Sequence, residues 1–258
     1  MSMTAVLGID IGGSGIKGAP VDLSKGEFVT DRLRIPTPTP STPQAVADVV
    51  AQIADHFSDA IGDAPIGVTI PSVVTHGMTR SAANIDKSWI NAPAEQIFAE
   101  CLGRPVHLAN DADAAGIAEV KYGAAADHPG LVMVTTLGTG IGTALIYRGV
   151  LVPNTELGHI EIDGHDAETQ AAASAKTRLG LKYSEYIPRL QRYYETLEKL
   201  FSPDLFVVGG GISKESERFL PHLVLQTPII PAKLRNKAGI IGAAWLAAEA
   251  AGRPDLLA

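Results

Sequence analysis

Two stretches of the chain share one pattern, in which a short apolar run, a glycine-rich turn and a second β-rich run follow one another. In the first, Leu7–Ile11 ends in glycines and leads into Ile16–Leu23, which lacks helical periodicity and contains a proline. In the second, Leu131–Leu137 and Thr143–Tyr147 flank another glycine-rich segment. Because β-rich runs joined by glycine turns are typical of hairpins, the pattern predicts two hairpins.

Alternating strands and helices are predicted between and after these hairpins. Buried strands are expected at Ile66–Ile70, Val106–Ala109 and Leu205–Val208, which are short apolar runs. Helices are expected after a cap at Ser41 or Thr42, over Ala114–Tyr122, from Ser184 onward and over the Ala-rich segment Ala238–Ala251. This alternation predicts an α/β fold in one compact unit.

Composition and charge narrow the class of protein. The 258 residues are 46% hydrophobic and 19% charged, which argues against disorder, and the net charge of −7 argues against nucleic-acid binding by the whole protein. The single cysteine, Cys101, cannot form an internal disulfide or a thiolate metal cage. The best apolar stretch, Ala238–Ala248, is about half a bilayer span, and the N-terminus lacks a signal-peptide pattern. We therefore expect a soluble, cytoplasmic protein with no membrane or nucleic-acid partner.

The first glycine turn has the spacing G-x-G-x-x-G over Gly13–Gly18, but not the context of a dinucleotide-binding loop. Those glycines would have to open a helix, whereas here the chain continues as a strand. The chain also has no P-loop sequence. The turn is therefore either a plain tight hairpin or an anion cradle, in which backbone N–H groups, the Ser14 hydroxyl and Lys17 face a phosphate.

A second glycine turn, Gly138–Gly142, favours the anion cradle. If it faces Gly12–Gly15, phosphoryl oxygens can be held from both sides by donors that need no reorganisation. Asp10, beside the first turn, can hold Mg²⁺ through water because this ion keeps part of its hydration shell. Asp10 can equally be an Asx-type turn residue. Together, the two turns and Asp10 indicate phosphoryl transfer.

Four motifs resemble, in the same order, those of the ROK sugar kinases, which have an actin-like, RNase H-like fold. They are Gly8–Ser14, Asn110-Asp111-Ala112, Gly138–Gly142 and Glu156-Leu157-Gly158-His159. Within that family, the short length and the segments 209–214 and 234–239 most resemble the polyphosphate glucokinases and polyphosphate/ATP glucomannokinases. The resemblance implies a two-lobed sugar kinase fold with a cleft. The smaller lobe would comprise residues 1–110 and 239–258, with the closing helix, and the larger lobe residues 111–238.

The resemblance also implies which residues bind the substrates. Sugar hydroxyls would contact Asn84, Asn110, Asp111, Glu156, His159 and Glu168. Phosphate would contact Gly12, Gly13, Ser14, Gly15, Lys17, Thr139, Gly140, Gly210 and Gly211, and Asp10 would hold Mg²⁺ through water. From the residues alone, Asn84 can equally cap a turn, Trp89 can serve packing and His159 can be a structural histidine. Most members of the family carry a zinc-binding cysteine cluster after the Glu-x-Gly-His motif. Because this chain has none there, we expect no structural zinc.

Transfer to a primary hydroxyl requires a carboxylate that takes the hydroxyl proton as the new O–P bond forms. On the family match, we expect Asp111 to be this base. A residue directly after a strand faces the ligand, whereas Asp113, in the first helical turn, would stabilise the helix dipole.

Charge is unevenly distributed along the chain. Residues 176–237 contain 11 Lys and Arg against 6 acidic residues, although the whole chain has a net charge of −7. Such a block would attract a long polyanion in a salt-dependent way, but it can equally consist of solvated helix faces. We expect part of it to line a polyphosphate path, with ATP as a second donor at the glycines of 209–211.

The sequence thus predicts a Mg²⁺-dependent kinase acting on the 6-hydroxyl of glucose, with mannose as a further candidate acceptor and with a homodimer as the family's usual state. Three alternatives remain: a strictly ATP-dependent hexokinase, a sugar-sensing repressor of the same family, and an actin-like ATPase. The repressor is disfavoured because the chain begins at its first strand, without a DNA-binding domain. An actin-like ATPase would lack a convergent hexose site.

Overall fold

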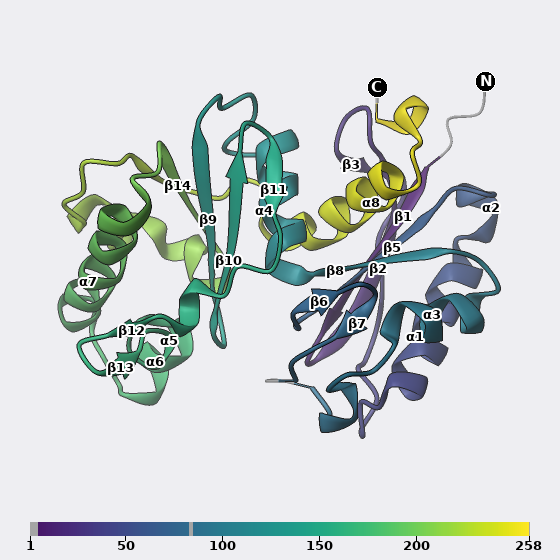
Figure 1. Ribbon diagram of the computed structural model, residues 1–258, viewed down its shortest axis with the longest axis horizontal. Helices are drawn as coiled ribbons and strands as arrows, with labels where there is room; N and C mark the ends of the chain where they lie inside the picture. The colour runs from purple at the N-terminus through teal and green to yellow at the C-terminus, as the bar shows by residue number, and fades with distance from the viewer. Residues whose placement is uncertain (1–4, 83–84, 258) are drawn as a thin grey trace. The chain divides into compact units, whose positions relative to one another are not determined.

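The computed structural model describes residues 5–82 and 85–257, and its contacts divide the chain into two units (Figure 1). Unit 1 comprises Met1–Ala118 and Lys237–Ala258, and unit 2 comprises Glu119–Asn236. Each unit has its own main sheet and its own hydrophobic core.

The sheet of unit 1 begins with the predicted first hairpin. β1 (Val6–Gly12) and β2 (Gly15–Asp22) are antiparallel, and Gly12 pairs with Gly15 at the turn. β5 (Ile66–Ile70) and β8 (Val106–Asn110) extend the sheet in parallel from β1, which confirms both predicted strands. The order is β3-β2-β1-β5-β8, with β4 also paired to β2. The shorter strands are β3 (Glu27–Phe28), β4 (Leu33–Ile35), β6 (Val74–Thr75) and β7 (Met78–Thr79).

Helices cover both faces of this sheet. Successive side chains of a strand point to opposite faces of the sheet, so both faces can be covered. α1 and α3 share one core with β1 and β5 on one face, and α8 packs on the opposite face. A Cβ atom on Gly8 or Gly67 would lie 1.9 Å from a carbonyl oxygen of α8, so these glycines let the helix lie directly on the strands. The helices are α1 (Pro43–His56), which begins at the predicted cap Thr42, α2 (Ser58–Ile61), α3 (Ala94–Leu102) and α8 (Ala238–Ala250).

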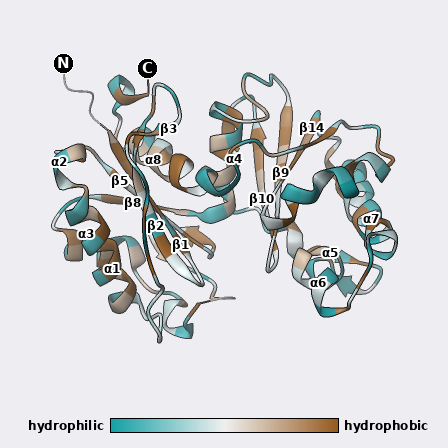
Figure 2. Ribbon diagram, turned by 180° about the vertical axis from the view of Figure 1, so that it is seen from behind, coloured by the Kyte–Doolittle hydropathy of each residue, from teal (hydrophilic) through white to brown (hydrophobic). Residues whose placement is uncertain are grey.

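The sheet of unit 2 contains the predicted second hairpin. β9 (Leu131–Leu137) and β10 (Ile141–Tyr147) are antiparallel, and β14 (Leu205–Gly209) lies parallel to β9. The order is β11-β10-β9-β14-β15, and β9 and β14 are brown along most of their length in Figure 2. α7 (Tyr183–Phe201) begins one residue before the predicted start and contributes buried tyrosines to the core. The other elements are β11 (Val150–Val152), β12 (Glu161–Ile162), β13 (His165–Asp166), β15 (Ile229–Pro231), α5 (Glu168–Ala171) and α6 (Ala173–Arg178).

Short 3₁₀ turns complete the described structure. They lie at Lys87–Trp89, Leu157–His159, Gly211–Arg218, Leu220–His222, Arg235–Lys237 and Pro254–Leu256. Among the described helices, none has the length and apolar character needed to cross a bilayer.

One helix differs from its prediction in a way that matters for the site. α4 (Asp111–Lys121) begins three residues before the expected start at Ala114, directly after β8. Asp111 and Asp113 are therefore both in the first helical turn, and the expectation that only Asp113 belongs to the helix is wrong. The physical reason is a cap supplied by Asn110, which accepts hydrogen bonds from the N–H groups of Ala112 and Asp113 at 2.8 and 3.1 Å.

The same helix explains why the units differ from the lobes drawn from the sequence. The first predicted division, after residue 110, precedes the one after Ala118 because α4 starts in unit 1 and ends in unit 2. The second, after residue 238, lies two residues beyond the one after Asn236. Unit 1 also contains more residues than unit 2, the reverse of the expected order of size.

Candidate functional site

The predicted site residues of unit 1 that the structure describes collect at one edge of its sheet. Asp10 pairs with Thr69 between β1 and β5, and Ile70 pairs with Asn110 between β5 and β8. Because these strands are parallel, their carboxyl ends meet at the same edge, so Asp10, the first glycine turn and Asp111 all lie along it.

Asp10 is held by two neighbours at this edge. The Thr69 hydroxyl donates to Oδ1 at 3.2 Å, and Lys17 Nζ lies 3.5 Å from Oδ2. The Asp10 side chain keeps 23% of its surface exposed. One partly exposed carboxylate next to an ammonium group suits a hydrated Mg²⁺ that is bound through water better than direct chelation.

Arg34, which the sequence analysis did not single out, lies against the first glycine turn. Its Nη2 donates to the carbonyl oxygen of Ser14 at 2.7 Å, and its guanidinium occupies the place that a Cβ on Gly15 would take. The only sequence signal for it was its position in a short apolar run, because the contact depends on β4 pairing with β2. The turn thus has two nearby cations, Arg34 and Lys17.

The two aspartates of α4 differ in accessibility. Asp113 is 2% exposed, whereas Asp111 is half-buried. The Asn110 side chain caps α4 through its oxygen and donates from Nδ2 to the carbonyl oxygen of Ser72 at 3.1 Å. Asn110 therefore holds the helical turn that carries Asp111, and its predicted contact with sugar stays a prediction.

Two other residues considered in the sequence have different outcomes. Asn84 lies outside the described residues. Trp89 is fully buried, and its indole N–H donates to the carbonyl oxygen of Ser41 at 2.7 Å, which gives it the packing role considered from the sequence.

In unit 2, the second and third glycine turns adjoin one another. β14 pairs with β9 up to Gly209 and Thr136, so the turns that follow these parallel strands lie at the same edge. Gly210 has a φ of 80°, and a Cβ there would lie 2.3 Å from the carbonyl oxygen of Leu137. Glycine is thus required at 210 for this close approach, which brings the predicted phosphate contacts of both turns together.

Glu168 also lies against the second glycine turn. Its Oε2 accepts a hydrogen bond from the backbone N–H of Ile141 at 3.1 Å, and a Cβ on Gly140 would lie 2.3 Å from that oxygen. Gly140 therefore leaves the space that the Glu168 carboxylate occupies. A predicted sugar contact and a predicted phosphate contact are neighbours in unit 2.

The Glu-x-Gly-His motif packs on the same hairpin. A Cβ on Gly158 would lie 2.2 Å from the carbonyl oxygen of Ile141, so only glycine lets the motif approach β10. Glu156 and His159 flank this contact and are exposed. His159 Nδ1 lies 2.8 Å from Asp166 Oδ2.

The electrostatics of this region favour a charged histidine and a less acidic glutamate. The hydrogen bond to Asp166, helped by Glu168 and Glu156, raises the pKa of His159 above its ordinary value. Partial desolvation, helped by Glu168, raises the pKa of Glu156. A histidine whose charged form is favoured, next to three carboxylates, is a polar surface suited to a ring of hydroxyl groups.

The same side chains are close enough to be considered for a metal ion. Ligand atoms of His159, Asp166 and Glu168 all lie within 4.8 Å of one another. However, Asp166 and Glu168 each already accept a backbone hydrogen bond, and Asp166 also binds the imidazole. The expected absence of structural zinc stays a prediction.

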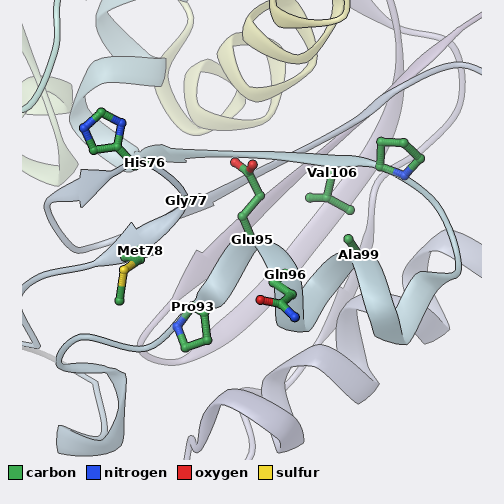
Figure 3. A pocket seen from close by; sticks show the side chains of 9 residues that line it. His76, Gly77, Met78, Pro93, Glu95, Gln96, Ala99 and Val106 are labelled. Carbon is green, nitrogen blue, oxygen red and sulfur yellow. The ribbon is translucent and has the colours of Figure 1, made fainter.

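A separate pocket of about 620 Å³ lies in unit 1 between α3 and β8 (Figure 3). His76, Glu95 and Gln96 are among its lining residues, and Figure 3 shows Glu95 directed from α3 toward β8. Glu95 Oε2 accepts from the N–H of Leu108 at 3.1 Å, so its carboxylate joins the helix to the strand. None of the predicted site residues that the structure describes lines this pocket.

Comparison with known proteins agrees with this geometry. The profile of the ROK family matches residues 6–176. The chain belongs to the ROK family. It is 49% identical to the polyphosphate glucokinase of Mycobacterium tuberculosis over 238 residues, which are 92% of this chain and 89% of that protein.

Solved structures of the ROK family are similar throughout the chain. The inorganic polyphosphate/ATP-glucomannokinase from Arthrobacter sp. strain KM aligns with a TM-score of 0.91 and 55% identity over 96% of this chain and 99% of that one. A ROK glucokinase from Streptomyces griseus, solved with glucose and AMPPNP, aligns with a TM-score of 0.80 and 25% identity over 95% and 99%. The predicted family and the predicted actin-like α/β sugar kinase fold are confirmed.

Proposed function

We propose that this ROK protein transfers a phosphoryl group from inorganic polyphosphate, and from ATP as a second donor, to the 6-hydroxyl of glucose. The observation that carries the proposal is the similarity, over nearly the whole chain, to a polyphosphate glucokinase and a polyphosphate/ATP-glucomannokinase. Mannose as a further acceptor and a homodimer belong to the proposal as predictions from the family, and a cytoplasmic location belongs to it as a prediction from the sequence.

Asp111 is the proposed general base. It takes the proton from the 6-hydroxyl as the oxygen attacks the phosphoryl group, and its partial exposure makes it accessible to a sugar where the buried Asp113 is not. The Asn110 cap fixes the first turn of α4 and so limits the positions available to the Asp111 side chain. Glu156, His159 and Glu168 are the proposed hydrogen-bonding partners of the other hydroxyls.

Phosphoryl oxygens are the proposed ligands of the glycine turns. Gly12–Gly15 would supply backbone N–H groups with Ser14, Lys17 and Arg34 alongside, while Thr139, Gly140, Gly210 and Gly211 would do so from unit 2. Asp10 would hold Mg²⁺ through water, and the ion would neutralise part of the donor's negative charge.

For the donor path, the structure distinguishes between cations of the basic block. Arg192 is paired with Asp163 through two hydrogen bonds of 2.8 Å, so its charge is largely compensated. Lys176 Nζ and Arg218 Cζ lie 4.5 and 4.3 Å from the centre of the Tyr183 ring, although Arg218 also pairs with Glu215. We place the start of the polyphosphate path at Lys176 and Arg218. Arg218 is close in sequence to the exposed Lys214, which follows the third glycine turn.

One assay tests the proposed function against its alternatives. Purified protein is incubated with Mg²⁺, glucose or mannose, and ATP or long-chain polyphosphate at low and high salt, and the hexose 6-phosphate formed is measured. We expect glucose 6-phosphate with both donors and a loss of polyphosphate activity at high salt, because exposed charges are screened. Formation of hexose phosphate with ATP but not with polyphosphate would support the alternative of a strictly ATP-dependent hexokinase. Absence of hexose phosphate with both donors would contradict the proposal.

A further inference from the structure

The Asp166 carboxylate joins two of the residues that the proposed function assigns to the sugar. Its Oδ2 lies 2.8 Å from His159 Nδ1, and its Oδ1 accepts from the backbone N–H of Glu168 at 3.1 Å. Asp166 ends β13, one strand of the two-stranded ribbon formed with β12, and Glu168 opens α5. One side chain therefore spans the gap between the Glu-x-Gly-His motif and the residue that contacts the second glycine turn.

The backbone of Asp166 holds the ribbon without help from the carboxylate. Asp166 pairs with Glu161 across the ribbon, and its carbonyl oxygen accepts from the Thr169 hydroxyl at 2.6 Å. The N–H of Ala167 donates to the carbonyl oxygen of Ile160 at 3.0 Å. Changes to the carboxylate can therefore be made while these bonds remain.

The carboxylate also determines which nitrogen of His159 carries a proton. An ionised carboxylate only accepts hydrogen bonds, so the contact at 2.8 Å requires the proton on Nδ1. Nε2 then faces away from Asp166, as an acceptor in the neutral ring and as a donor in the imidazolium. A hydrogen bond to the far nitrogen orients a ligand histidine in just this way at many functional sites.

We propose that Asp166 is the positioning residue of the sugar site, which holds His159 by its Nδ1–H and Glu168 by its backbone so that both present their polar atoms to the same hexose. The inference rests on the proposed function for the identity of the ligand. It adds a residue that neither the family motifs nor the sequence analysis singled out, and it gives a single side chain control over two sugar contacts.

Asp166→Asn is the decisive variant, because it keeps the shape of the side chain and reverses one hydrogen bond. The asparagine oxygen still accepts from Glu168 N–H, which turns the amide NH₂ toward His159 and forces the proton onto Nε2. We expect the KM for glucose to rise about 10- to 100-fold, with the KM for polyphosphate and the melting temperature nearly unchanged. Asp166→Glu, which restores the charge, should recover part of the loss.

Asp163→Asn is the matched control. Asp163 lies in the turn of the same ribbon, is exposed and pairs with Arg192, and its φ of 53° is one that asparagine adopts readily. This change removes the same charge from the same ribbon without touching His159. We expect it to leave the KM for glucose unchanged.

Two further measurements separate positioning from a structural role. In a double-mutant cycle, Asp166→Asn should have little effect on glucose KM once His159 is replaced by Gln, because the two residues act as one unit. In the pH profile of kcat/KM for glucose, the ionisation of His159 should move to lower pH in Asp166→Asn. The pKa of His159 should still stay partly raised, because Glu156 and Glu168, which also raise it, are unchanged in this variant.

Nitrogen chemical shifts of the imidazole test the inference in the unmodified protein. We expect them to show a protonated Nδ1 in His159, and a neutral ring with its proton on Nε2 would overturn the inference even if no variant folds. An unchanged glucose KM in Asp166→Asn, or additive effects with His159→Gln, would overturn it as well. Absence of hexose phosphorylation by the unmodified protein would instead contradict the proposed function.

Discussion

Replacing Gly140 with alanine should displace the Glu168 carboxylate while leaving the fold intact. The added Cβ would lie 2.3 Å from Oε2 and 3.2 Å from Cδ of Glu168. Non-bonded atoms of this kind require more than 3 Å, so the oxygen must withdraw by about 1 Å. Because the obstructing group is the end of a flexible side chain, the strain is relieved by its movement rather than by the backbone.

The cost of that movement should appear in catalysis. Withdrawal breaks the 3.1 Å hydrogen bond from Ile141 N–H and moves a proposed sugar contact. A misplacement of about 1 Å at a positioning group can cost about 100-fold in rate, which corresponds to about 2.7 kcal/mol. We expect kcat/KM for glucose to fall by this order, with a small change in melting temperature.

Gly138→Ala supplies the comparison within the same turn. A Cβ on Gly138 meets no atom within 4 Å, and Gly138 is not among the glycines with positive φ. This variant should stay within about threefold of the unmodified protein in glucose KM, as for an ordinary surface substitution. Both variants are assayed at saturating polyphosphate, with thermal unfolding followed in parallel. Equal glucose kinetics for Gly140→Ala and Gly138→Ala would refute the reasoning.

Three other changes test different parts of the site. Asp111→Asn should lower kcat by about 10²–10⁴ with a modest change in glucose KM, and near-normal turnover would show that the base is another group. Arg34→Gln should raise the KM for polyphosphate about tenfold, because it weakens the contact with the glycine turn. Arg32→Gln removes the same charge from a nearby exposed position and should leave this KM unchanged. Equal effects of the two variants would show that net charge, and not the contact with the glycine turn, determines the KM. Glu119 is 1% exposed and accepts from the N–H groups of Ala124, Lys233 and Leu234, so Glu119→Gln should cost about 2 kcal/mol of unfolding free energy in denaturant titrations. The exposed Glu100→Gln is its control, and a loss no larger than that of this control would contradict the role assigned to Glu119.

Local patterns predicted the elements of this fold well. Apolar periodicity, glycine and capping residues act within a few positions of the chain. They were sufficient to predict both glycine hairpins, the strands at Ile66–Ile70 and Leu205–Val208 and the helix capped by Thr42. The predicted start of α4 is wrong because Asn110 belongs to a sugar-kinase motif in the sequence but caps the helix in the structure.

For the candidate site, the sequence predicted several residues but not how they are arranged. Motif resemblance supplied Glu156, His159 and Glu168, but not their mutual arrangement. Arg34 and Asp166 carried no motif, and their roles depend on contacts with residues 20 and 7 positions away. Such contacts form only after strands pair and a ribbon folds back, so no pattern of neighbouring residues can signal them.

Information carried by neighbours along the chain was thus sufficient for the class of fold, the two glycine hairpins and the family motifs. Folding in three dimensions added the burial of Asp113, the closeness of Glu168 to Gly140 and the link from Asp166 to His159. The reason is that backbone conformation responds mainly to local sterics and hydrogen bonding, whereas accessibility and side-chain pairing depend on which distant segments pack together.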